Sequence, residues 1–149
     1  MMKDDIPEFE EKRKSVRLVG SLAVELIIPG VTRTQHGYTY DINNEGIGVE
    51  ADYLDQEALS ALDKGNLSVE LVIHSSHEKK VRALCRVIWF QKDDELTEEK
   101  YLIGFKFLKI NPAELKLILL RARNQTKWLG IVVVSLFILL LIFLASLLS

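Results

Sequence analysis

The chain has 149 residues and a formal net charge of −2, which disfavours a basic face for binding DNA or RNA. Its single cysteine, Cys85, excludes an internal disulfide bond and is typical of a reducing compartment. All charged residues precede residue 128, and this part of the chain is long enough for one hydrophobic core but too short for two.

Strand patterns begin after an acidic N-terminal segment, residues 1–11, which we expect to be flexible. Six later segments show the alternating polarity or the β-branched composition of strands. They are Ser21–Ile28, Tyr38–Ile42, Ile47–Glu50, Leu67–Ile73, Val81–Phe90 and Leu102–Ile110. Turn residues at Pro29–Gly30 and Asn43–Gly46 indicate links of hairpin length.

One short helix is expected among the strands, at Leu54–Lys64, where apolar residues recur at helical spacing before Gly65. The chain shows no βαβ spacing of the kind that builds a parallel sheet. Six antiparallel strands therefore predict an all-β fold, a six-stranded barrel rather than a doubly wound sheet. We place this barrel domain at residues 12–110.

Alternation within the strands assigns side chains to faces. In Tyr38–Ile42, both tyrosines and Ile42 alternate with polar residues, which predicts that they share one face. In the fifth strand, Cys85 falls in the pattern of the core. Trp89 and Phe90 are adjacent and should point to opposite faces, so that one of them belongs to the core.

An amphipathic helix that closes the barrel is predicted over residues 111–127. Asn111 suits the N-cap, and Pro112 suits the first helical position. The helix carries an apolar stripe that we expect to pack on the barrel. The stripe consists of Leu115, Ile118, Leu119 and Ala122.

Residues 128–148 contain no charge and match the length of about 20 residues that a transmembrane helix needs. A buried helix of a soluble protein is the alternative, which is disfavoured because so short a chain cannot surround it. Basic residues precede the span, at Arg121, Arg123 and Lys127, and predict a cytoplasmic soluble domain with a single-pass C-terminal anchor. Because no Gly or Pro separates the two segments, a continuous helix is predicted to hold the barrel close to the bilayer.

Two short motifs add to this pattern. Arg13 and Arg17 stand four apart just before the first strand, and Asp41 stands five residues before Gly46 at the turn after the second strand. Either motif alone is a weak signal, because paired arginines and Asp-to-Gly turns are common. At such a turn, Gly46 is expected to adopt a positive φ.

Together and in this order, the motifs resemble the PilZ domain, a bacterial receptor module for cyclic diguanylate (cyclic di-GMP). The segment Tyr101–Phe107 is also similar to the last strand of that family, and the resemblance extends over residues 12–123. It implies a six-stranded barrel with a closing helix and a bound cyclic dinucleotide. The ligand-binding residues that it implies are Arg13, Arg17, Asp41, Asn43 and Gly46, with Lys12 and Lys14 as secondary contacts.

The chemistry of these residue types suits that ligand. Arginine offers a planar fork that bonds to phosphate oxygens or to a guanine edge. The resemblance implies that Asp41 accepts from guanine N–H groups or orients an arginine, and that Gly46 lets the turn backbone approach closely. Asn43 stands where the family has serine, and it keeps a donor and an acceptor but places them farther out.

These observations predict a non-enzymatic receptor at the bacterial inner membrane, which changes conformation on binding cyclic di-GMP and regulates a membrane-associated protein partner. No catalytic set or metal site has matched residues, and no cofactor is expected besides the ligand. Two alternatives stay open. One is a degenerate PilZ adaptor that binds protein and no nucleotide, and the other is a structural subunit of a membrane complex.

Overall fold

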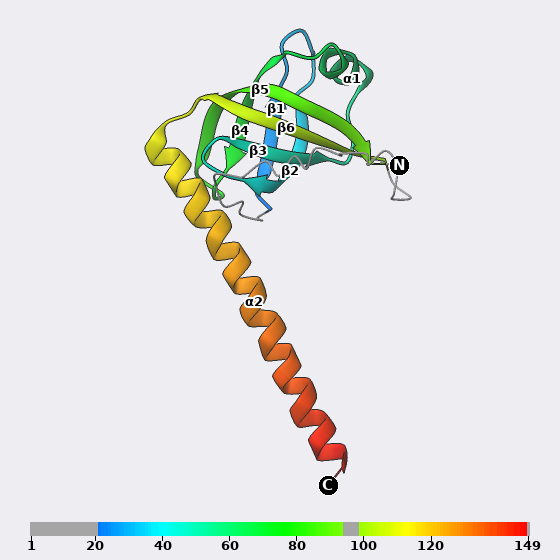
Figure 1. Ribbon diagram of the computed structural model, residues 1–149, viewed down its shortest axis with the longest axis vertical. Coiled ribbons are helices and arrows are strands. Elements are labelled where there is room, and N and C mark those ends of the chain that lie inside the picture. The colour runs from blue at the N-terminus through cyan, green and yellow to red at the C-terminus, as the bar shows by residue number, and fades with distance from the viewer. Residues whose placement is uncertain (1–20, 94–98, 149) are drawn as a thin grey trace, which may run out of the picture.

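The computed structural model describes residues 21–93 and 99–148, which form a closed antiparallel barrel with a long helix leaving one end (Figure 1). The strands follow one another around the barrel in the order β1-β2-β3-β6-β5-β4. They are β1 (Ala23–Ile27), β2 (Gln35–Ile42), β3 (Gly46–Ala51), β4 (Ser68–His74), β5 (Lys80–Asp93) and β6 (Lys100–Lys109). The helices are α1 (Gln56–Asp63) and α2 (Pro112–Leu148). The predicted all-β barrel with its C-terminal helix is confirmed.

Two pairings between strands that are distant in sequence close the barrel. β1 pairs with β4, where Val24 stands opposite Ile73, and β3 pairs with β6, where Val49 stands opposite Ile103. All four of these side chains are buried in one hydrophobic cluster inside the barrel. Burial of each such side chain stabilises the fold by about 1.5–3 kcal/mol. Packing inside the barrel therefore stabilises both strand pairings.

Cys85 lies inside the barrel, as its place in the alternation predicts, and its side chain is fully buried. Loss of hydration raises the pKa of its thiol to about 12. The thiol is therefore uncharged at neutral pH, and Cys85 serves the core as a small apolar residue.

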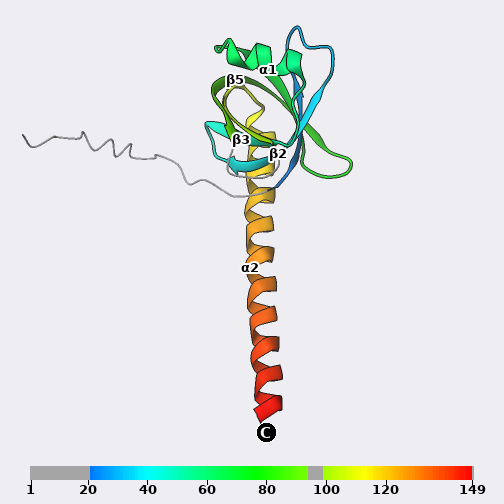
Figure 2. The ribbon, with the colours of Figure 1, turned by 90° about the vertical axis from the view of Figure 1, so that its right-hand side faces the viewer.

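Predicted turn and cap signals appear as hydrogen bonds. At the Pro-Gly turn, the amide of Val31 donates to the carbonyl of Ile28 at 3.1 Å, and Gly30 has a φ of +79°. The short helix α1 is capped by Asp55, whose side chain accepts from the amide of Ala58 at 2.8 Å. α1 lies at the end of the barrel away from the C-terminal part of α2 (Figure 2).

A β-bulge at Tyr40 breaks the predicted alternation in β2, because the register with β3 shifts between Thr39 and Asp41. Ile42 is consequently buried, whereas Tyr38 is exposed. The prediction that both tyrosines and Ile42 share one face is therefore wrong. One extra residue in the strand exchanges the faces of every side chain that follows it.

A second bulge lies in β5, where the register with β6 shifts between Val87 and Trp89. Ile88 and Trp89 consequently both face outward, with 61% and 44% of their surface exposed. Phe90 packs against the core and stacks on Tyr101, with ring centroids 5.9 Å apart. The prediction that one of the adjacent aromatic residues belongs to the core is confirmed for Phe90.

α2 is a single helix of 37 residues whose first turns cover the barrel. The predicted cap is present, since Oδ1 of Asn111 accepts from the amide of Ala113 at 2.9 Å. Ile118 and Ala122 of the predicted stripe are fully buried, and Leu119 packs beside them. The stripe therefore joins the helix to the core of the barrel.

Past the barrel, α2 exposes the apolar side chains of residues 130–147 on all sides. By length and composition, the helix is suited to crossing a membrane, and none of its apolar window is buried against the rest of the protein. This lack of burial distinguishes it from the core helix of a soluble domain. No break in the helix marks residue 128, so the predicted boundary of the membrane segment stays a prediction.

Candidate functional site

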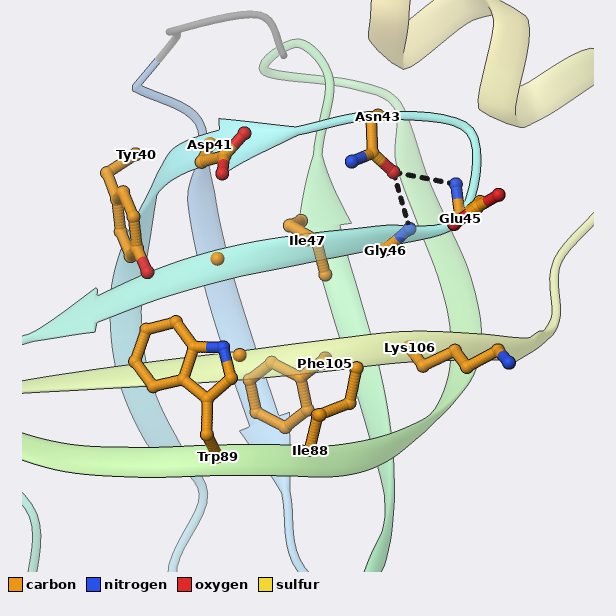
Figure 3. Close-up of a pocket in the computed structure, with 12 residues that line it drawn as sticks. Tyr40, Asp41, Asn43, Glu45, Gly46, Ile47, Ile88, Trp89, Phe105 and Lys106 are labelled. Atoms are coloured by element: carbon orange, nitrogen blue, oxygen red, sulfur yellow. Dashed lines mark hydrogen bonds between the residues drawn. The ribbon is translucent and has the colours of Figure 1, made fainter. Parts of the chain in front are cut away.

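The turn between β2 and β3 is built around the side chain of Asn43. Its Oδ1 accepts hydrogen bonds from the backbone amides of Glu45 at 2.7 Å and Gly46 at 2.9 Å (Figure 3). The backbone amide of Asn43 donates to the carbonyl of Gly46 at 3.0 Å. Short polar side chains often hold turns in this way. Nδ2 of Asn43 makes no hydrogen bond to the described residues. It is therefore the polar atom of this side chain that could contact a ligand.

Gly46 is needed for a reason that differs from the predicted one. Among the glycines that the structure describes, only Gly30 and Gly65 have a positive φ, so the prediction of a positive φ at Gly46 is wrong. A Cβ atom at Gly46 would instead collide with the carbonyl oxygen of Phe105 in β6. The missing side chain lets β3 begin in close contact with β6.

A pocket of about 380 Å³ lies beside this turn on the outer face of the barrel (Figure 3). β2, the turn and β3 contribute one side of its lining, and β5 and β6 contribute the other side. The pocket therefore spans the β3–β6 pairing that closes the barrel. Its lining residues are Tyr40, Asp41, Asn43, Glu45, Gly46, Ile47, Gly48, Ile88, Trp89, Gly104, Phe105 and Lys106.

Two aromatic rings of this pocket lie against glycines. Gly48 of β3 and Gly104 of β6 stand opposite each other in the strand register. A Cβ atom added to Gly48 would lie 2.6 Å from the ring of Tyr40, and one added to Gly104 would collide with the indole of Trp89. Both rings also lie at β-bulges, that of Tyr40 in β2 and that of Trp89 next to Ile88 in β5. Bulges re-aim side chains, and here they direct two aromatic rings to one place on the barrel.

Three charged side chains line the pocket, and their net charge is negative. Asp41 is half-buried on β2, whereas Glu45 and Lys106 are exposed. Two carboxylates outnumber one ammonium group, so the described lining suits N–H donors and flat rings better than phosphates. A phosphate-bearing ligand would need additional cations from elsewhere in the chain.

Three of the predicted binding residues, Asp41, Asn43 and Gly46, are brought together in this pocket. The predicted basic residues lie outside the part of the chain that the structure describes, and their roles stay predictions. These residues are Lys12, Arg13, Lys14 and Arg17. The predicted flexible segment 1–11 also lies outside the described residues.

Sequence reasoning missed Tyr40, Trp89 and Lys106 as lining residues. A usable signal existed for the two rings, because Gly48 and Gly104 interrupt strand patterns. Glycine within a strand often marks a bulge or a close approach of another group. For Lys106 the sequence carries no comparable signal, since an exposed lysine on a strand is ordinary.

Residues 11–122 match the model of the PilZ domain family. No curated protein matches the chain in sequence. Among solved structures, the chain is similar to the PilZ domain with c-di-GMP of YcgR from Escherichia coli. That match has a TM-score of 0.65 and 13% sequence identity, and it covers 80% of this chain and 98% of that one.

Two longer proteins contain a similar fold. The Bacillus subtilis inhibitor of motility (MotI/DgrA) matches with a TM-score of 0.56 and 20% identity over 78% of this chain and 52% of that one. The Borreliella burgdorferi PlzA protein in complex with c-di-GMP matches with a TM-score of 0.55 and 16% identity over 80% and 53%. The chain thus spans about half the length of these two proteins. At such identities, the likeness shows the shared fold.

We predict that Asn43→Ala lowers the free energy of unfolding by about 1–2 kcal/mol, because two turn amides lose their acceptor. Urea unfolding of the full chain in detergent, followed by circular dichroism, measures this change. Asn44→Ala is the matched control, because Asn44 is exposed and its side chain makes no hydrogen bond to the described residues. Equal losses in both variants would show that the side chain of Asn43 does not hold the turn.

Proposed function

This chain belongs to the PilZ domain family, and we propose that it is a non-enzymatic receptor for cyclic di-GMP. The observation that carries the proposal is the pocket where Asp41, the Asn43 turn and Trp89 meet on the outer face of the barrel. The solved PilZ domain of YcgR and the PlzA protein both contain c-di-GMP. Their overall similarity to this chain supports the same class of ligand here.

The pocket lining suits the guanine bases of such a ligand. The half-buried carboxylate of Asp41 can accept N–H groups of a guanine edge, and the side-chain nitrogen of Asn43 can donate to an acceptor on that edge. Trp89 rests one face of its indole on Gly104 and is 44% exposed. The opposite face is therefore available for a base to stack on it.

The two phosphates of the ligand require positive charge that the described lining lacks. Lys106 is its one cation, against the carboxylates of Asp41 and Glu45. Arg13 and Arg17 would supply two guanidinium groups, each able to bond bidentately to phosphate. In this proposal, the described pocket holds the bases and the arginine segment closes over the phosphates, with Lys12 and Lys14 adding secondary attraction.

We predict that cyclic di-GMP binds the full chain in detergent micelles, and that Asp41→Ala and Arg13→Ala each weaken binding at least about tenfold, because a hydrogen bond to a charged group is lost. Isothermal titration calorimetry measures the dissociation constants. Arg33→Ala is the control, since Arg33 is an exposed arginine outside this pocket.

Absence of binding heat at ligand concentrations on the order of 50 μM would contradict the receptor proposal and favour the adaptor that binds protein alone. Binding that survives both Asp41→Ala and Arg13→Ala would instead show that the ligand site lies elsewhere. Hydrolysis of the nucleotide during incubation, followed by chromatography, would contradict the non-enzymatic part of the proposal.

We further propose that α2 anchors this receptor in the cytoplasmic membrane, with the barrel on the cytoplasmic side. Exposure of the apolar residues 130–147 supports the proposal, since water-exposed side chains of this kind each forgo about 1.5–3 kcal/mol of burial. Trp128 and the basic residues Arg121, Arg123 and Lys127 precede this stretch, as expected at a cytoplasmic interface.

We predict that the full chain stays with membranes after washing with high salt and with alkaline carbonate, because the helix is held by burial of apolar surface. Immunoblotting of the washed fractions measures this. Leu136→Asp combined with Leu139→Asp should release the protein, since each central aspartate costs about 3 kcal/mol on insertion. Leu120→Asp is the control on the exposed face of α2 ahead of the span. A native chain that washes off, or a control that does, would contradict the anchor.

A pair of hydrogen bonds supports a relay from ligand to anchor. The amide of Ser21 donates to Oε1 of Gln125 at 3.1 Å, and Nε2 of Gln125 donates to the carbonyl of Ser21 at 3.4 Å. Ser21 follows Arg17 by four residues, and Gln125 lies on α2 just before the apolar stretch. Closure of the arginine segment over a ligand would pull directly on this contact, and through α2 it would reach a membrane-associated partner.

We predict that Gln125→Ala uncouples α2 from the ligand, because its side chain is the link to Ser21. Hydrogen exchange measured by mass spectrometry should show ligand-dependent protection of residues 121–127 in the native chain. Gln125→Ala should lose that change while its affinity for cyclic di-GMP is retained. Asn124→Ala, a neighbouring amide that makes no hydrogen bond to Ser21, should keep it. Unchanged coupling in Gln125→Ala would contradict the relay.

A further inference from the structure

A second hollow lies where α2 leaves the barrel, and it shares no lining residue with the pocket beside the Asn43 turn. Its volume is about 550 Å³, and its lining residues are Arg121, Asn124, Gln125, Trp128 and Val132. We propose that this niche binds the headgroup of an anionic phospholipid. The inference rests on the proposed membrane anchor, which would place these residues at the level of the lipid headgroups.

Charge is the first argument for an anionic occupant. Arg121 is exposed, and its guanidinium makes no ion pair with any residue that the structure describes. Among the described residues, no carboxylate lines the niche. The side-chain amides of Asn124 and Gln125 stand one turn along the helix on the same side, that of Gln125 also bonded to Ser21. Guanidinium and amide N–H groups are strong donors to phosphate oxygens, so the polar end of the niche is complementary to a phosphodiester.

The gradient of polarity along the niche is the second argument, because it matches a lipid better than a free anion. Arg121 lies at one end and Val132 at the other, about 16 Å apart along the helix axis. Trp128 stands between them and is 69% exposed. An indole ring at this level contacts both headgroup and upper acyl chain. The apolar end would contribute nothing to binding inorganic phosphate.

The face of the helix is the third argument, because the niche is distinct from the general positive charge before the span. At 3.6 residues per turn, Arg123 points about 200° around the axis from Arg121, and Lys127 lies on the same side as Arg123. Neither Arg123 nor Lys127 lines the niche. The general charge attracts any anionic surface, whereas Arg121 and Trp128 form a specific site beside the barrel.

The test compares two arginines of one helix turn. The full chain in detergent micelles is given phosphatidylglycerol or phosphatidylcholine with the same acyl chains, and native mass spectrometry counts the lipids it retains. We expect the native chain to prefer phosphatidylglycerol, and Arg121→Gln to reduce that preference about fivefold. Arg123→Gln should leave it within about twofold, because it removes the same charge from another face. Trp128→Leu should reduce retention of phosphatidylglycerol as well.

Equal losses in Arg121→Gln and Arg123→Gln would overturn the site and show a diffuse surface charge. Displacement of phosphatidylglycerol by millimolar inorganic phosphate would overturn the lipid as occupant and leave an anion site. Retention of both lipids alike would also contradict the proposal. Circular dichroism confirms that each variant is folded. Failure of the anchor is detected separately, because such a protein would already be released by the carbonate wash.

Discussion

The barrel and its pocket both depend on the pairing of β3 with β6. This pairing joins the meander β1–β3 to the meander β4–β6, and it has glycine at 46, 48 and 104. A Cβ atom at any of these positions would meet the backbone of β6 or an aromatic ring. Glycine in strands ordinarily weakens them, so three in one pairing need a compensating gain. Here the gain is a stretch of backbone without side chains, at Gly48 and Gly104, on which the rings of Tyr40 and Trp89 can lie.

The same constraint explains why the pocket faces outward. The interior of the barrel is filled by buried apolar side chains such as Val49 and Ile103. The bulges at Tyr40 and Ile88 each add one residue on the outside of the barrel, on either side of the paired Gly48 and Gly104. An outward pocket lies open to a segment that can close over it. In the proposed receptor, the arginine segment before β1 has that role.

How far the fold could be predicted from the sequence depends on how local each signal is. Asn111 as a cap, the stripe containing Ile118, and the core position of Cys85 follow from neighbouring residues alone, and all are confirmed. The bulge at Tyr40 could not be predicted, because a bulge is set by the register of the partner strand. The positive φ expected at Gly46 is wrong for the same reason, since the contact that requires glycine there is with Phe105, which is distant in sequence.

The weakness of the contact between Ser21 and Gln125 is itself an argument for a switch. Two neutral hydrogen bonds at an exposed site contribute about 0.5–1.5 kcal/mol each, so in the proposed receptor ligand binding would make or break them at little cost. Ile118 and Ala122, by contrast, are fully buried and hold α2 on the barrel in either state. A helix that stays packed at Ile118 and Ala122 but loses its contact at Gln125 would pivot about these two buried residues. Because α2 is uninterrupted, such a shift at the barrel would be carried along the helix into the proposed membrane anchor, past the niche at Arg121 and Trp128.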